Sequence, residues 1–135
     1  MYNTAMSEYI RVSKAVIVNE KGKALVVFRG STAPSRALTW DLPGGIVEDG
    51  ETTLQTVQRE VLEETGLNIQ ADSFSKTDKY TDHRYCWTVY KAKVGSELVE
   101  ISWEHDEYKW VDRQEIKGLK NTPAFLKQLI LNVIS

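Results

Sequence analysis

The chain has 135 residues, of which 41% are hydrophobic and 27% charged, and these values are typical of one folded domain rather than a disordered or membrane protein. A formal net charge of −2 excludes the positive field that drives sequence-independent binding to a nucleic acid polymer. Cys86 is the single cysteine, which excludes an internal disulfide and favours a reducing compartment. With no long apolar run and no signal-peptide pattern, we expect one domain, residues 1–135, in the cytoplasm and without a membrane partner.

The first part of the chain predicts two strands and a loop. Residues 11–18 and 24–28 are rich in Val and Ile, and the polar segment 19–23 between them is typical of a hairpin turn. Residues 30–38 are mostly small and polar and indicate a loop. The run Trp40-Asp41-Leu42-Pro43-Gly44-Gly45 follows, and its proline and glycines exclude a helix there.

A helix is predicted over residues 53–65. Thr52 and Gln55 have the spacing of a capping box, and Gly66 stands where a helix usually ends in left-handed geometry. Apolar residues recur at helical spacing along one face: Leu54, Val57 and Val61. This face is expected to pack on the core.

The second half predicts more strands and a final helix. Residues 67–69, 85–94 and 108–111 are enriched in aromatic and branched side chains, as strands are. In the second of these segments Tyr85, Trp87 and Val89 alternate to one face. Thr122 and Pro123 favour the start of an amphipathic helix that runs to the end of the chain. The fold class is therefore α/β in the broad sense (α+β), a mixed sheet covered by helices.

The predicted helix carries three glutamates, Glu60, Glu63 and Glu64, beside its apolar stripe. Like charges this close repel one another, so a cation is expected to offset them. Carboxylates without any His or Cys suit Mg²⁺, and Mn²⁺ is an alternative. Three glutamates alone are more often a solvated helix face. The flanking residues decide between these interpretations.

Those flanking residues resemble the Nudix hydrolase family. The family's box reads Gly, five residues, Glu, seven residues, Arg-Glu, an aliphatic residue, any residue, Glu-Glu, any residue, Gly and an aliphatic residue, and residues 45–67 fit every fixed position. The matching residues are Gly45, Glu51, Arg59, Glu60, Val61, Glu63, Glu64, Gly66 and Leu67. Residues 40–45 and 107–111 also resemble the family's entry to the box and its late strand. The resemblance implies an α/β/α sandwich.

The resemblance also implies roles for the box residues. The metal positions are Gly45, through its carbonyl, and Glu60, Glu63 and Glu64. Glu63 holds a second metal or orients the attacking water. Arg59 is expected to pair with Glu51 and lock the loop onto the helix. These roles come from the family pattern and not from the spacing alone.

The general base stays open between Glu63 and a carboxylate of the late loop, Glu104 or Glu107. Similar proteins carry a late catalytic Glu several residues before the last strand, which slightly favours Glu104 over Glu107. His83 and His105 have no motif support, and we leave them outside the catalytic set.

The substrate is expected to be recognised outside the box. Aromatic residues able to stack a purine, or to form core, are Tyr80, Tyr85, Trp87 and Tyr90. Guanidinium groups able to contact phosphates belong to Arg29, Arg36 and Arg84.

The resemblance favours a nucleoside triphosphate pyrophosphatase that cleaves a diphosphate linkage of a small nucleotide-like substrate by Mg²⁺-assisted water attack. Alternatives are a hydrolase of ADP-ribose or dinucleoside polyphosphates, a nucleotide-binding sensor without turnover, and a purely structural acidic surface. A homodimer through a sheet edge or the terminal helix also stays open.

Overall fold

The computed structural model describes residues 9–33, 36–95, 99–100 and 105–134. Within these residues seven strands form one sheet. The strands are β1 (Ile10–Val18), β2 (Ala24–Arg29), β3 (Trp40–Asp41), β4 (Gly44–Ile46), β5 (Ser75–Thr81), β6 (Tyr85–Lys93) and β7 (His105–Val111). The helices are α2 (Thr53–Thr65), the short 3₁₀ helix η1 (Ala71–Ser73), α3 (Arg113–Gly118) and α4 (Ala124–Leu131).

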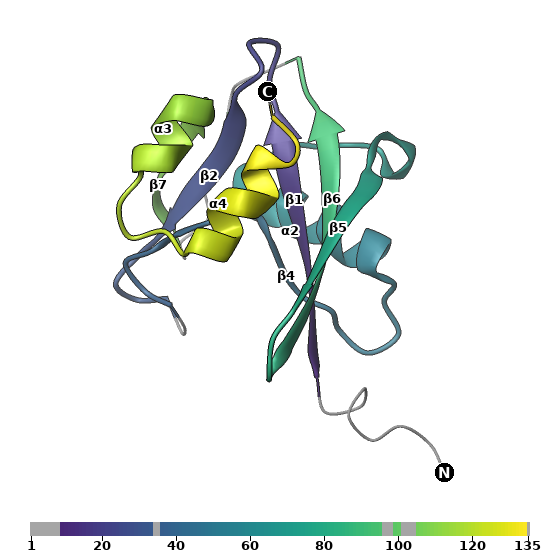
Figure 1. Ribbon diagram of the computed structural model, residues 1–135. Helices are drawn as coiled ribbons and strands as arrows, with labels where there is room; N and C mark the ends of the chain where they lie inside the picture. The colour runs from purple at the N-terminus through teal and green to yellow at the C-terminus, as the bar shows by residue number, and fades with distance from the viewer. Residues whose placement is uncertain (1–8, 34–35, 96–98, 101–104, 135) are drawn as a thin grey trace.

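The sheet is mixed, with the order β3-β2-β1-β6-β5, while β4 pairs with β1 and β7 pairs with β2. The central strand β1 runs parallel to β6, and the other pairs are antiparallel. Figure 1 shows α3 and α4 in front of the sheet and α2 behind it. This arrangement confirms the predicted fold class, a mixed sheet between helices.

Two buried clusters hold the helices to the sheet. Side chains of β1 alternate between its faces, so Val16 packs in a cluster with Leu126 of α4, whereas Ile17 packs with Val57 and Val61 of α2. The apolar stripe predicted for the central helix therefore does face the core. Burial of such side chains is the main term that stabilises the sandwich.

Helix α2 begins and ends where the sequence predicts. The Thr52 hydroxyl accepts from the Gln55 N–H, and the Gln55 side chain accepts in return from the Thr52 N–H. At the other end Gly66 adopts a φ of 76° and donates to the Leu62 carbonyl. This local chemistry sets the length of the helix and so the position of its glutamates.

The strand predicted at residues 67–69 is absent, which corrects that prediction. Leu67 and Ile69 are buried beside α2, but side chains rather than a strand satisfy their backbone. The Leu67 N–H donates to the Thr65 hydroxyl, and the Ile69 carbonyl accepts from the Gln58 amide. The apolar alternation marked burial and not sheet pairing.

The structure adds elements that the sequence did not predict, namely the short strands β3 and β4, the 3₁₀ helix η1, the exposed edge strand β5 and the short helix α3. Helix α4 begins one residue later than expected, with Pro123 as its N-cap instead of Thr122. Among the described residues no helix has the length and apolar character needed to cross a bilayer.

Candidate active site

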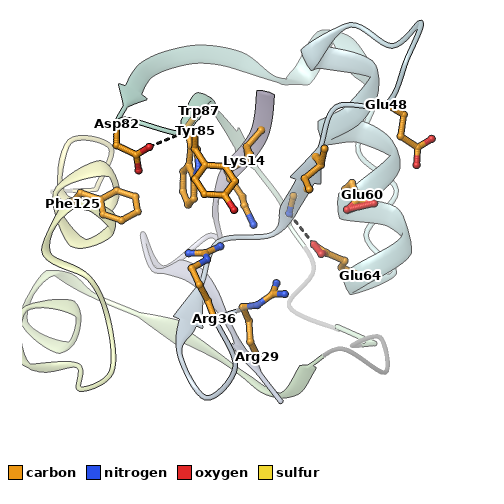
Figure 2. Close-up of a pocket in the computed structure, with 14 residues that line it drawn as sticks. Lys14, Arg29, Arg36, Glu48, Glu60, Glu64, Asp82, Tyr85, Trp87 and Phe125 are labelled. Atoms are coloured by element: carbon orange, nitrogen blue, oxygen red, sulfur yellow. Dashed lines mark hydrogen bonds between the residues drawn. The ribbon is translucent and has the colours of Figure 1, made fainter. Parts of the chain in front are cut away.

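Gly44 and Gly45 follow the bend at Pro43, open strand β4 and lie against α2; we call this segment the diglycine turn. The Gly44 N–H donates to Oε1 of Glu64 at 2.8 Å, a bond drawn in Figure 2. A Cβ on Gly45 would overlap the carboxylate of Glu60, and a Cβ on Gly44 would overlap the backbone of β1 at Ser13. Only glycines allow this approach, which brings two helix carboxylates onto the turn.

Arg59 joins the loop that precedes α2 to the carboxylates of the helix. Its Nε and Nη2 donate to the two carboxylate oxygens of Glu51 at 2.7 and 2.9 Å. Its Nη1 donates to Glu60 at 2.8 Å and to Glu63 at 3.1 Å. The Arg59 hydrogen bonds lower the pKa of Glu51 to about 2. The pair that the sequence predicted, Arg59 with Glu51, is therefore present in bidentate form.

The two carboxylates at the turn, those of Glu60 and Glu64, are only partly neutralised by nearby positive charges. Burial raises the pKa of Glu64 to about 8, although Lys14 and the Gly44 N–H favour its ionised form. Burial and a hydrogen bond with Glu63 raise the pKa of Glu60 to about 7, against the opposing effect of Arg59. A nearby cation stabilises the ionised form of carboxylates whose pKa is raised in this way.

These residues fit a hard divalent metal. The side-chain donors at the turn are the carboxylate oxygens of Glu60 and Glu64, and Mg²⁺ takes such ligands together with water and phosphate oxygens. No group of three His, Cys, Asp or Glu side chains forms a ready-made metal cluster in the part of the chain that the structure describes.

A cavity of about 490 Å³ opens beside the turn, and three cationic side chains line it: Lys14, Arg29 and Arg36. All three surround Asp41, which is fully buried. Its Oδ2 lies 3.0 Å from Lys14 Nζ, 2.7 Å from Arg36 Nη2 and 3.7 Å from Arg29 Nη1. Burial acts to raise the pKa of Asp41, but Lys14 and Arg36 outweigh it and the pKa is lowered. One carboxylate shared by three cations leaves excess positive charge toward the cavity.

The end of the cavity away from α2 is aromatic. Tyr85, Trp87 and Phe125 line it, together with the carboxylate of Asp82, as Figure 2 shows. The Phe125 ring stacks on Tyr80 with centroids 4.1 Å apart and meets the edge of Trp87 at 5.1 Å. These contacts fix the aromatic side chains at this end of the cavity, and Lys14 Nζ and Arg36 Cζ each lie 5.4 Å from the centroid of the Trp87 ring.

The structure brings most of the candidate residues together. Those that line the cavity are Gly45, Glu60, Glu64, Arg29, Arg36, Tyr85 and Trp87. The lining does not include Glu63, Arg84 or Glu107, all of which are exposed. Arg84 instead places its guanidinium 5.8 Å from the centroid of the Tyr85 ring. Tyr90 is buried beside α2, and Glu104 lies outside the described residues.

Sequence reasoning missed several lining residues, chiefly Lys14, Glu48, Asp82 and Phe125. Lys14 did carry a signal, because a lysine in the middle of the apolar segment 11–18 must be buried and paired. No comparable signal marks Asp82 or Phe125, which reach the cavity through the arrangement of distant elements.

A mixed sheet between helices, with a glutamate-rich helix held on a diglycine turn, is the architecture of Nudix-type domains. A NUDIX domain model matches residues 9–133, and the chain belongs to this family.

Known proteins similar to this chain include sequence relatives and solved structures. It is 32% identical over 101 residues to a MutT-like protein of Streptomyces ambofaciens, a match that covers 75% of this chain and 62%, less than two thirds, of that protein. It is 28% identical over 106 residues to a Bacillus subtilis protein named as a candidate 8-oxo-dGTP diphosphatase, covering 76% of this chain and 66% of that one. The crystal structure of a MutT protein from Methanosarcina mazei superposes with a TM-score of 0.77 at 32% identity, covering 93% of this chain and 92% of that one.

Proposed function

We propose that this protein hydrolyses a diphosphate linkage in a small nucleotide, and that its substrates are nucleoside triphosphates, cleaved to a monophosphate and pyrophosphate. One observation carries the proposal: the cavity sets the carboxylates of Glu60 and Glu64 against a group of cations over Asp41. A polyphosphate chain complements both sides at once, because its oxygens bind a metal at one wall and cations at the other. The name of the Bacillus relative supports a triphosphate substrate.

The residues that would hold Mg²⁺ are Glu60, Glu64 and the carbonyl of Gly45, with Glu63 available for a second ion or for orienting water. When bound, the ion neutralises diphosphate charge and lowers the pKa of water. Arg59 keeps Glu60 and Glu63 oriented through its two hydrogen bonds. Mn²⁺, which also accepts oxygen ligands, is the alternative ion.

The cations position the phosphates. Lys14 and Arg36 are each tied to Asp41, so their donors are held at the cavity before any substrate arrives. Pre-organised donors of this kind stabilise the charge that develops on the leaving phosphate without a further ordering cost. Aromatic side chains at the opposite end leave room for the base of the nucleotide.

The candidates for the general base are Glu63, Glu104 and Glu107, and a substitution experiment decides among them. Glu63 lies on α2 beside the metal-binding side chains and is held by Arg59 at 3.1 Å, while Glu107 is exposed on β7. In this experiment Glu63, Glu104 and Glu107 are replaced by Gln, one at a time. The base is the position whose loss lowers kcat with an unchanged KM and removes the acidic limb of the pH profile.

The test of the function is turnover by the wild type and by Glu64→Gln. Both are incubated with excess Mg²⁺ and nucleoside triphosphates, ADP-ribose, dinucleoside polyphosphates and a 5′-triphosphorylated oligonucleotide, and phosphate and pyrophosphate are assayed. Glu64→Gln is expected to keep its fold and lose roughly 10²- to 10³-fold in kcat. Glu20→Gln, in the exposed turn between β1 and β2, is the matched control.

Two results would contradict the proposal. Near-normal turnover by Glu64→Gln would remove the metal-ligand assignment. Binding without cleavage by the wild type across the whole panel would favour the sensor.

A further inference from the structure

The turn between β5 and β6 presents a carboxylate that the phosphate chemistry does not use. Asp82 begins this turn, and its N–H donates to the Tyr85 carbonyl at 3.0 Å. Its Oδ1 accepts from the N–H groups of Arg84 and Tyr85 at 2.8 and 2.7 Å. Its Oδ2 has no hydrogen-bond partner among the described residues, although Asp82 lines the cavity. The two oxygens of one carboxylate therefore differ, since one holds the turn and the other is free to bind.

The position of Asp82 in the cavity is opposite the metal-binding wall. Figure 2 shows it beside Phe125 and near Tyr85, with Glu60 and Glu64 on the far side. A nucleotide whose phosphates meet Lys14 and the glutamates must place its base at the aromatic end, because that end remains for the rest of the molecule. Aromatic rings bind the faces of a base with little regard to its identity. The protein's polar group that meets the edge of the base, here the Asp82 carboxylate, must then distinguish one base from another.

The chemistry of Asp82 restricts what that edge can be. The backbone N–H groups of Tyr85 and Arg84 lower the pKa of Asp82, so its carboxylate is ionised at neutral pH. An ionised carboxylate accepts hydrogen bonds and cannot donate them. It attracts the N–H groups of an amino substituent and repels a carbonyl oxygen in the same place.

We propose that Asp82 is a specificity-determining residue, whose Oδ2 accepts a hydrogen bond from the exocyclic amino group of the nucleobase. The protein then selects amino-bearing bases over analogues that carry hydrogen or oxygen at that position. This inference rests on the proposed function, because it assumes that the phosphates occupy the cationic end. Hydrogen bonds to a charged group discriminate by roughly 10- to 100-fold.

Asp82→Asn tests the recognition of the base by Oδ2 separately from the structural role of Oδ1 in the turn. Asparagine keeps an Oδ1 that accepts from both turn N–H groups, and it replaces the free acceptor with a donor. The same charge is lost in the matched control Asp72→Asn, which lies in the exposed η1 outside the cavity. Thermal unfolding of both variants checks that the turn and the fold are retained.

The readout is the ratio of kcat/KM within pairs that differ at one substituent: dGTP with dITP, dCTP with dUTP, and dATP with dITP. The wild type and Asp72→Asn are expected to favour the amino-bearing member of at least one pair by roughly 10-fold or more. Asp82→Asn is expected to bring that ratio to about one or to reverse it. Equal ratios in the wild type and Asp82→Asn, or no preference in the wild type, would overturn the inference.

A binding measurement separates this inference from the proposed function. The same nucleotides are titrated, with Mg²⁺, into Glu64→Gln and into Glu64→Gln combined with Asp82→Asn, and the dissociation constants are compared. If the wild type hydrolyses no nucleotide, the proposed function fails, yet a binding preference that Asp82→Asn abolishes still supports the role of Asp82. An unchanged preference overturns that role alone, and neither hydrolysis nor binding of any nucleotide by the wild type overturns both.

Discussion

The N–H of Gly44 donates a 2.8 Å hydrogen bond to the carboxylate of Glu64, which joins the turn at the cavity to the last part of α2. The next residue, Gly45, lies so close to Glu60 that a Cβ has no room. Turn and helix thus fix each other, because a backbone N–H holds the Glu64 carboxylate and the Arg59 guanidinium holds that of Glu60. Such pre-organisation is what a metal site shared with substrate requires.

Gly45→Ala is expected to weaken metal-dependent turnover while leaving the fold intact. The added Cβ displaces the Glu60 carboxylate, and loss of ligand orientation typically costs roughly 10- to 100-fold in metal affinity or activity. A Mg²⁺ titration of turnover and a Mn²⁺ binding assay measure the effect. Gly118→Ala in α3, where a Cβ meets no atom within 4 Å, is the control. Metal dependence of Gly45→Ala equal to that of the wild type would contradict the proposed metal site.

Much of the proposed metal-binding wall was predictable because its geometry is local. Helical spacing places Glu60 and Glu64 one turn apart, and the capping residues Thr52 and Gly66 fix where the helix starts and ends. The pairing of Arg59 with Glu51, eight residues apart, was expected from the family pattern and not from the spacing alone. Short-range chemistry of this kind can be recognised in a sequence.

Much of the rest of the cavity was not predictable, for the opposite reason. Asp82 comes from the turn between β5 and β6, Phe125 from α4 and Lys14 from β1. They meet because β1 runs parallel to β6, a pairing between segments far apart in the chain. The strand that was wrongly predicted at residues 67–69 has a related cause. Alternating apolar residues indicate that side chains are buried, but they do not show whether the segment pairs in a sheet.

Arg59→Lys is expected to lower the affinity for Mg²⁺ roughly 10-fold, although the charge is kept. A lysine ammonium is a point charge and does not hold both oxygens of Glu51 while also reaching Glu60. The pKa of Glu51 should then rise from about 2 toward its usual value. Turnover at varied Mg²⁺ and NMR titration of the carboxylate measure the two effects. Arg11→Lys, on an exposed part of β1, should change neither, and an unchanged Mg²⁺ affinity in Arg59→Lys would argue against its positioning role.

Asp41→Asn is expected to destabilise the fold by about 3–5 kcal/mol, the cost of breaking a buried ion pair. Lys14 loses its buried partner at 3.0 Å, and its charge then faces Arg36 without neutralisation. Denaturant unfolding measures the change. In the Asp41→Asn background Lys14→Met should cost less than in the wild type, because the lysine no longer has a carboxylate to satisfy. Strictly additive costs would show that the two residues are not coupled.

The stability of the metal-free protein is expected to fall as the pH rises from 6 to 8.5. Burial raises the pKa of Glu64 to about 8 and, with the Glu63 hydrogen bond, that of Glu60 to about 7, whereas both have a reference value of 4.5. Between about pH 4.5 and 8 the folded protein therefore binds more protons than the unfolded chain, so its free energy of unfolding decreases with pH. At lower pH the sign reverses, since Asp41 and Glu51 have lowered pKa values and lose their contribution as they become protonated. Melting temperatures in EDTA at pH 6, 7 and 8.5 measure this dependence.

Mg²⁺ should oppose this loss, and more strongly at pH 8.5 than at pH 6, because ligands must release their protons before they bind a metal. The increase in melting temperature on adding Mg²⁺ is compared at the two pH values. Replacing both Glu60 and Glu64 by Gln should flatten the pH dependence in EDTA and remove the Mg²⁺ effect, because the groups that titrate are also the proposed ligands. A stabilisation by Mg²⁺ that is equal at both pH values, or that survives the double substitution, would place the metal elsewhere. The pH dependence and the metal response thus test a single set of carboxylates by two separate measurements.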